Sequence, residues 1–257
     1  MIYYFSGTGN TKYVAGSIAS KIGEESKAIA RLDASNEKFE GSHLGFMFPI
    51  YSWGVPPIML DFIKALPDSF IDDVKKRKMP VWMVCTCGDE TGEAPQMFQK
   101  AIGERGLKSL GFWSVIMPNT YILLPGFDVD LDEIETYKID HAPKRVAEIA
   151  SDIQRGEWRT DVMFGPKAGL KTKLIYPLFK KWGINPRKWN CTQECISCGK
   201  CAGACPVGNV KLHSGRPVWG KDCVSCLACY HICPTHAIEY GRATSRKGQY
   251  RCPLKAH

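Results

Sequence analysis

The sequence predicts a parallel α/β domain followed by a small, cysteine-rich α+β domain. Three observations lead to this prediction. Apolar runs rich in β-formers alternate with helical patterns over residues 1–154, a glycine- and hydroxyl-rich loop follows the first run, and a four-cysteine pattern occurs twice after residue 194. Strands that alternate with helices at this pitch indicate a parallel sheet covered on both faces. A chain of 257 residues suits one domain of ordinary size and a smaller one.

The first expected strand, residues 2–5, leads into the loop S-G-T-G-N-T and then into a helix with Val14, Ile18 and Ile22 on one face. Backbone N–H groups and the dipole at a helix start favour a phosphate group, which hydroxyl side chains can also bind. The loop has no GK[ST] or GxGxxG pattern, and an ordinary strand-to-helix turn is the alternative interpretation. The candidate phosphate-binding residues are Ser6, Thr8, Gly9, Asn10 and Thr11.

Four further strands and three helices complete the predicted sheet domain. The strands are expected at residues 27–31, 43–49, 81–85 and 110–117. The helices are expected at 55–65, 92–104 and 131–154, and Pro143 is expected to kink or split the last one. Five strands suit the order 2-1-3-4-5, in which a ligand binds outside the carboxyl ends of the strands.

The S-G-T-G-N-T loop resembles the FMN-phosphate loop of flavodoxins, so the other loops at this sheet edge are candidates for binding a flavin. Aromatic side chains after the third strand could stack on the ring, and glycines after the fourth would let backbone amides reach its pyrimidine edge. Ordinary packing is the alternative for each loop. The candidates are Pro49, Ile50, Tyr51, Ser52, Trp53, Gly54, Thr86, Cys87, Gly88, Asp89, Gly92, Asn119 and Tyr121.

The duplicated cysteine pattern reads C-I-S-C-G-K-C-A-G-A-C-P and C-V-S-C-L-A-C-Y-H-I-C-P. This is the bacterial ferredoxin motif, whose fourth cysteine ligates the other cluster. A zinc ribbon would lack the third cysteine, and a disulfide framework would need a secreted context. Residues 186–243 therefore resemble a clostridial-type domain with two [4Fe-4S] clusters. The expected ligand sets are Cys195, Cys198, Cys201 and Cys233 for one cluster, and Cys223, Cys226, Cys229 and Cys205 for the other.

Charge is divided unevenly along the chain. Residues 1–150 carry 16 Lys and Arg against 20 Asp and Glu, a net charge of −4, whereas residues 151–257 carry 18 against 6, a net charge of +12. A basic half favours nucleic acid, an anionic membrane surface or an acidic protein partner. The cluster cysteines and the lack of an apparent signal or spanning segment favour the cytoplasm.

A basic, aromatic connector is expected at residues 155–185, between domains at 1–154 and 186–257. We expect it to dock the two domains, with Leu174, Ile175, Leu178, Phe179 and Trp182 buried; a membrane-surface helix is the alternative. The four remaining cysteines, at positions 85, 87, 191 and 252, are expected to be packed or incidental. Two histidines, at positions 231 and 236, lie beside the second cysteine motif and could tune its cluster.

With both ends considered, the chain resembles the flavodoxin/ferredoxin fusion proteins of anaerobes, the EFR-type ferredoxins. The resemblance includes Y-F-S-G-T-G-N-T, M-P-N-T-Y and both cysteine motifs. It implies FMN and two [4Fe-4S] clusters in one electron-transfer protein. We expect electron exchange with an external low-potential carrier, such as an acidic ferredoxin, and no nucleic-acid role or membrane span. The alternative is a reductase of a small unsaturated, nitro or quinone compound, with Tyr51 and Tyr121 as candidate proton donors.

Overall fold

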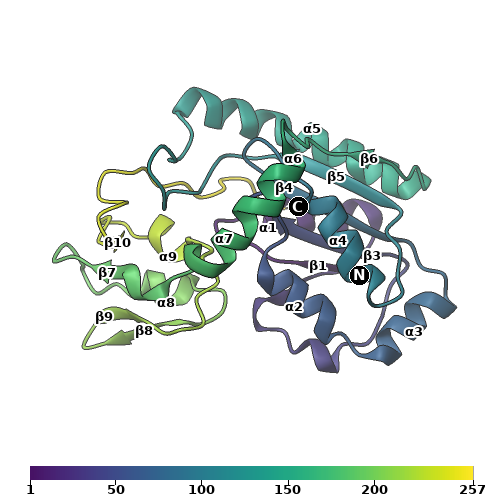
Figure 1. Cartoon of the computed structure of the whole chain (residues 1–257), viewed down its shortest axis with the longest axis horizontal. Helices are drawn as coiled ribbons and strands as arrows, with labels where there is room; N and C mark the ends of the chain where they lie inside the picture. Colours follow the sequence, from purple (N-terminus) through teal and green to yellow (C-terminus); the bar gives the residue numbers. More distant parts are fainter. Residues whose placement is uncertain (257) are drawn as a thin grey trace.

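A computed structural model describes residues 1–256 of the chain. Its larger part is a parallel sheet with the strand order β2-β1-β3-β4-β5-β6, which confirms the predicted flavodoxin-like α/β fold and its 2-1-3-4-5 order (Figure 1). A sixth strand extends the expected five at the β5 edge. The strands are β1 (Ile2–Tyr4), β2 (Ser26–Ala28), β3 (Leu44–Pro49), β4 (Val81–Cys87), β5 (Gly111–Ile116) and β6 (Thr160–Asp161).

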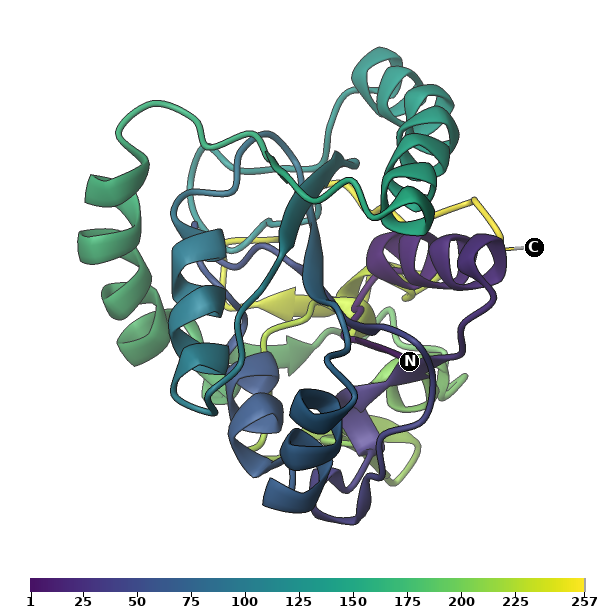
Figure 2. The same cartoon turned by 90° about the vertical axis from the view of Figure 1, so that its right-hand side faces the viewer.

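Helices cover both faces of this sheet, as Figure 2 shows. Each face of the sheet has its own hydrophobic core. Successive residues of β3 point to opposite faces, so Phe46 and Phe48 belong to one core and Met47 belongs to the other. Helices α1 and α5 cover the Met47 face, and α2, α3 and α4 cover the other. The helices are α1 (Asn10–Ile22), α2 (Pro57–Ala65), α3 (Asp68–Lys76), α4 (Ala94–Gly103) and α5 (Asp132–Arg155).

Helix α5 runs unbroken through Pro143, so the expectation that this proline splits the helix is wrong. Proline removes one backbone hydrogen bond, but the buried side chains of Ala142, Val146 and Ile149 hold this part of the helix against the sheet. Packing against the sheet therefore outweighs the tendency of the proline to end the helix. Helix α3, which the sequence analysis did not predict, follows α2 after a short turn.

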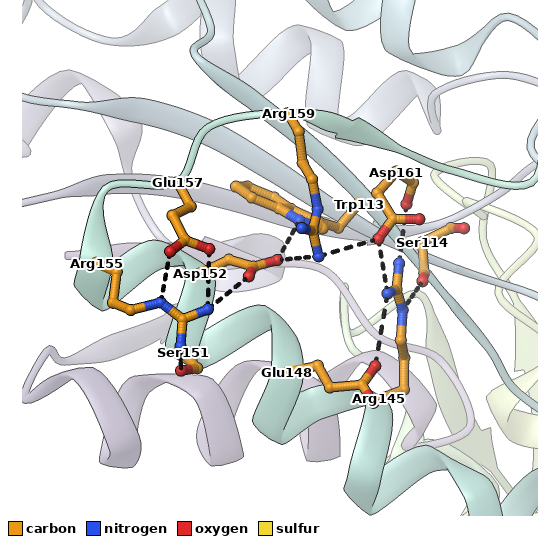
Figure 3. A network of polar contacts seen from close by, with 10 residues as sticks. All are labelled: Trp113, Ser114, Arg145, Glu148, Ser151, Asp152, Arg155, Glu157, Arg159 and Asp161. Carbon is orange, nitrogen blue, oxygen red and sulfur yellow. Dashed lines mark hydrogen bonds and ion pairs between the residues drawn. The ribbon is translucent and has the colours of Figure 1, made fainter.

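Side chains of α5 and its following turn attach the short strand β6 to the sheet (Figure 3). Arg145 donates to the Ser114 carbonyl oxygen over 3.1 Å and pairs with the Asp161 carboxylate at 2.8 Å. Arg159 pairs at 2.7 Å with the buried Asp152 carboxylate, which also accepts the Trp113 indole N–H. A two-residue strand shows no sequence periodicity, so these long-range contacts explain why β6 was not predicted.

The smaller part of the chain is an α+β unit around the cysteine motifs. Strand β7 (Trp189–Cys191) pairs with β10 (Ile238–Tyr240), and β8 (Val210–His213) forms a hairpin with β9 (Arg216–Trp219). Two short helices, α8 (Lys200–Ala204) and α9 (Ala228–His231), each carry the third cysteine of one motif. Their shared core is small and includes four of the motif cysteines.

A helical segment, Ala168–Gly183, lies between the two parts and contacts the sheet domain through Thr172, Tyr176 and Phe179. The Tyr176 hydroxyl donates to the Val55 carbonyl oxygen, and Thr172 donates to that of Trp53. Of the five residues expected to dock, Phe179 does so, and the expectation is wrong for the other four. Four of the five expected docking residues are exposed, namely Leu174, Ile175, Leu178 and Trp182.

The C-terminal tail returns to the sheet domain. The Cys252 backbone N–H donates to the Thr8 carbonyl oxygen over 3.0 Å, so Cys252 is packed against the predicted phosphate loop. His231 accepts the Tyr250 backbone N–H at Nδ1, and its Nε2 lies 2.9 Å from the Thr120 carbonyl oxygen. His231 thus joins the tail to the sheet domain. Within residues 1–256, no helix is both long enough and apolar enough to cross a membrane.

Candidate functional site

A cavity lies outside the carboxyl ends of the central strands. All four predicted loops contribute to it, and we call it the sheet-edge cavity. This is the location that the order of a doubly wound sheet predicts for a ligand. The predicted residues that line it are Ser6, Thr8, Asn10, Thr11, Pro49, Ile50, Tyr51, Ser52, Thr86, Cys87, Gly88, Asn119 and Tyr121.

Five predicted binding residues do not line this cavity: Gly9, Trp53, Gly54, Asp89 and Gly92. The Trp53 indole N–H donates to Glu90, and its ring lies 5.2 Å below the Lys171 ammonium group. A Cβ atom at Gly92 would come within 2.7 Å of the Thr172 hydroxyl, and one at Gly54 within 2.5 Å of the Tyr176 ring. These glycines leave room for the helical segment 168–183.

Several polar side chains at the cavity hold its loops together. Thr11 and Thr86 share a buried hydroxyl hydrogen bond of 2.8 Å. Asn10 donates to the Pro118 carbonyl oxygen over 3.1 Å and accepts from the Tyr250 hydroxyl over 2.7 Å. Thr8 lines the cavity and takes part in neither of these side-chain interactions. Helix α1 begins beside it, so unpaired backbone N–H groups at the helix start are available for an anion.

A nearly buried ion pair positions the loop after β5. Asp130 accepts hydrogen bonds from the backbone and side-chain amides of Asn119, at 3.0 and 2.9 Å, and pairs with Lys138 at 2.7 Å. Burial alone would raise the pKa of Asp130, but the hydrogen bonds from Lys138 and Asn119 lower it overall. Sequence reasoning missed both charged residues, because neither lies at the end of a strand.

The cavity also has walls that the sequence analysis did not predict as part of this site. Phe179 from the helical segment contacts Tyr51 and Tyr121, with ring centroids 6.0 and 6.3 Å apart. These three rings give one part of the cavity the aromatic surface that a flat ring system needs, while the α1 start suits a phosphate. The additional lining residues are Gly7, Met117, Pro118, Thr120, Phe179, Ser225, Cys226 and Leu227.

The eight motif cysteines line two further cavities. The first cysteine cavity is lined by Cys195, Cys198, Cys201 and Cys233. The second cysteine cavity is lined by Cys205, Cys223, Cys226 and Cys229. In each cavity three cysteines of one motif therefore meet the fourth cysteine of the other motif.

Hydrogen-bond donors surround the sulfurs of the second cysteine cavity. Backbone N–H groups of Asn209 and Ser225 donate to Cys205 and Cys223 sulfurs over 3.1 and 3.4 Å. The indole N–H of Trp219 is buried without an acceptor and faces the same cavity. Burial raises the pKa of the Cys229 thiol to about 12. N–H donors beside buried sulfurs fit thiolates of an iron–sulfur cluster.

No three His, Cys, Asp or Glu side chains within the described chain are arranged to hold a single metal ion. The cysteines instead lie in two sets of four, each set lining its own cavity. Four cysteines around one cavity are the ligand number of a [4Fe-4S] cluster.

The second cysteine cavity adjoins the sheet-edge cavity, because Cys226 lines both. The hydroxyl of Tyr51, which also lines the sheet-edge cavity, is buried without a protein partner. Burial raises the pKa of Tyr51 well above its usual value, and the nearby thiols of Cys226 and Cys223 add to the effect. The structure thus brings two predicted cofactor sites into direct contact.

The fold and cavities define a parallel α/β domain joined to a 4Fe-4S dicluster domain. Residues 194–238 match the family model described as "4Fe-4S dicluster domain". A search of curated proteins finds no match. Among solved structures, the chain is similar to rubredoxin oxygen:oxidoreductase from the anaerobe Desulfovibrio gigas, with 11% identity and a TM-score of 0.35. That match covers 59% of this chain and 36% of the other.

Proposed function

We propose that this chain is an iron–sulfur flavoprotein that transfers electrons between two [4Fe-4S] clusters and FMN, and exchanges them with an external low-potential carrier. The observation that carries this proposal is the position of Cys226, which lines both the second cysteine cavity and the sheet-edge cavity. A cluster held by Cys226 would lie directly beside a flavin in the neighbouring cavity.

The residues that line each cavity are the proposed ligands of the cofactor in that cavity. Cys195, Cys198, Cys201 and Cys233 would hold one cluster, and Cys205, Cys223, Cys226 and Cys229 the other. Ser6, Thr8 and the start of α1 would hold the FMN phosphate, and Tyr51, Tyr121 and Phe179 would enclose the ring. When bound, the clusters would carry single electrons and FMN would take up one or two.

Contacts within the chain would hold the two proposed cofactor sites together. The carbonyl oxygen of Cys226 lies against Gly7 of the phosphate loop, and the His231 ring links α9 to the loop at Thr120. Since both sites belong to one chain, the effective concentration of the clusters at the flavin site would be high. Electron transfer between them would therefore need no diffusional encounter.

The exposed side chain of Cys198 supports the first cysteine cavity as the side that an external carrier would approach. Lys200 is exposed beside it, and residues 151–257 carry a net charge of +12. This surface favours an acidic redox protein, such as a ferredoxin, by electrostatic attraction.

Anaerobic reconstitution tests the cofactor assignment. We expect about eight irons per chain, the content of two [4Fe-4S] clusters, together with one FMN. Spectroelectrochemistry should then resolve three redox centres. A protein that holds zinc, only one cluster, or no flavin would contradict the proposal.

A further inference from the structure

The helical segment 168–183 exposes a continuous apolar surface. Leu170, Leu174, Leu178 and Trp182 are 55%, 57%, 50% and 59% exposed, and we call these four residues the apolar ridge. Their neighbours Thr172 and Tyr176 are buried against the sheet domain. In Figure 2 this helix stands at the outer edge of the molecule, on the left, with no other element outside it.

The geometry of the helix keeps the four side chains of the apolar ridge on one side of it. Residues four apart on an ordinary α-helix drift by about 40° at each step, because each residue turns the chain by about 100°. Here two π-helical turns, Lys171–Ile175 and Phe179–Gly183, alternate with short α-helical turns. A π-turn holds more residues than an α-turn, so it offsets that drift. The four ridge residues therefore lie along one side of the helix.

Positive charge surrounds the ridge. Residues 162–193 contain no Asp or Glu but seven Lys and Arg residues, of which Lys167, Lys173, Lys180 and Lys181 on or beside the helix are exposed. The Lys181 ammonium group lies 4.7 Å from the Trp182 ring centre. Lysines can bury their aliphatic stems while their charged ends stay at a polar boundary. Leu and Trp along one side of a helix, with lysines beside them, are typical of helices that lie in a membrane interface.

We propose that this helix binds the surface of an anionic lipid bilayer, with the apolar ridge inserted among the acyl chains and the lysines at the phosphate groups. An acidic protein would attract the lysines, but it would need a matching groove for a convex row of four large apolar side chains. A bilayer accepts such a ridge without a preformed groove. Because Phe179 of the same helix lines the sheet-edge cavity, this binding would place that cavity one helix away from the lipid.

Vesicle co-sedimentation of the full chain tests this proposal. We expect binding to vesicles of phosphatidylcholine with phosphatidylglycerol, weaker binding to phosphatidylcholine alone, and loss of binding as salt increases. The double variant Leu174→Glu/Leu178→Glu should lower the partition coefficient by about tenfold or more, because it replaces inserted apolar side chains with anionic ones. The matched control is Leu110→Glu/Leu131→Glu, which makes the same change at exposed leucines outside the helix and should bind as the unmodified chain does.

Two measurements keep the test decisive. Thermal unfolding should show that both double variants are folded, since all four leucines are exposed. Light scattering at increasing protein concentration should show no self-association that depends on the ridge. The proposal is overturned if the unmodified chain ignores anionic vesicles, or if the ridge variant binds as well as its control. Dimerisation that only the ridge variant abolishes, without vesicle binding, would also overturn it and would assign the ridge to a second copy of the chain.

Discussion

The backbone of Gly7 lies so close to Cys226 that a Cβ atom at position 7 would be 2.2 Å from the Cys226 carbonyl oxygen. Gly7 belongs to the predicted phosphate loop, and Cys226 lines both the sheet-edge cavity and the second cysteine cavity. The contact joins two loops that are more than two hundred residues apart in the chain. The two loops can therefore approach this closely only because position 7 is a glycine, which has no side chain.

Gly7→Ala should separate the two loops. The obstacle is a backbone carbonyl group, which cannot rotate away as a side chain can, so we expect the free energy of unfolding to fall by about 1–3 kcal/mol. Affinity for FMN should fall as well. The matched control is Gly203→Ala, because a Cβ atom there meets no atom within 4 Å. Denaturant unfolding and flavin titration of both variants measure the difference, and equal behaviour would show that the loops can move apart freely.

Thr8→Ala should weaken FMN binding selectively. A lost hydrogen bond to the charged phosphate should cost about 1.5–3 kcal/mol, which corresponds to about tenfold or more in affinity. Riboflavin has no phosphate, so its affinity should not change. Fluorescence titration of each flavin measures both effects. If unmodified protein binds riboflavin as tightly as FMN, the loop does not bind phosphate.

Asp130→Asn should loosen the loop at Asn119. The substitution leaves the nearly buried Lys138 ammonium group with only the more distant and exposed Asp89 carboxylate, 3.7 Å away, which should cost up to about 3 kcal/mol of stability. Flavin affinity at pH 7 should fall, because Asp130 holds the Asn119 side chain and backbone. Asp140→Asn, at an exposed position of the same helix, is the control.

The same ion pair predicts a pH dependence. The pKa of Asp130 is lower in the folded protein than its ordinary value of 3.8, so the unfolded chain takes up the proton first on acidification. The stabilisation of the folded protein by Asp130 is therefore complete at pH values above the ordinary pKa of 3.8. It is lost as the pH falls through the lower pKa that Asp130 has in the folded protein. The difference in unfolding free energy between unmodified protein and Asp130→Asn should be constant from pH 7 to pH 5, and should shrink below about pH 4. A difference that already disappears near pH 6 would contradict this assignment.

Single cysteine substitutions should test the crossed arrangement of the two motifs. Cys205→Ala should damage the cluster expected in the second cysteine cavity, and Cys233→Ala the one in the first, because each residue lines the cavity of the other motif. Electron paramagnetic resonance of each reduced variant should lose the signal of a different cluster. If each variant lost the cluster of its own motif, the ligation would not be crossed.

The sheet and the cysteine motifs were predictable because their signals are local. The loops 6–11 and 86–88 follow apolar strands directly, so their meeting at one sheet edge follows from parallel order. The contacts between the two parts were not predictable. Cys252 looked incidental because its partner, Thr8, lies at the other end of the chain. Which side of the helix 168–183 docks depends on small residues elsewhere, such as Gly54, which leaves room for Tyr176 while the leucines stay outside.

Stopped-flow reduction of the flavin by a reduced acidic ferredoxin tests the central claim most directly. The account predicts rapid reduction at low salt, slower reduction at high salt because the charges are screened, and near-complete loss when Cys223→Ala removes the cluster beside the flavin. Asp140→Asn, a change at an exposed position outside all three cavities, should leave the rate unchanged. If the Cys223→Ala protein, shown to retain FMN, reduced its flavin as fast as the unmodified chain, electrons would not pass through that cluster and the account would be wrong.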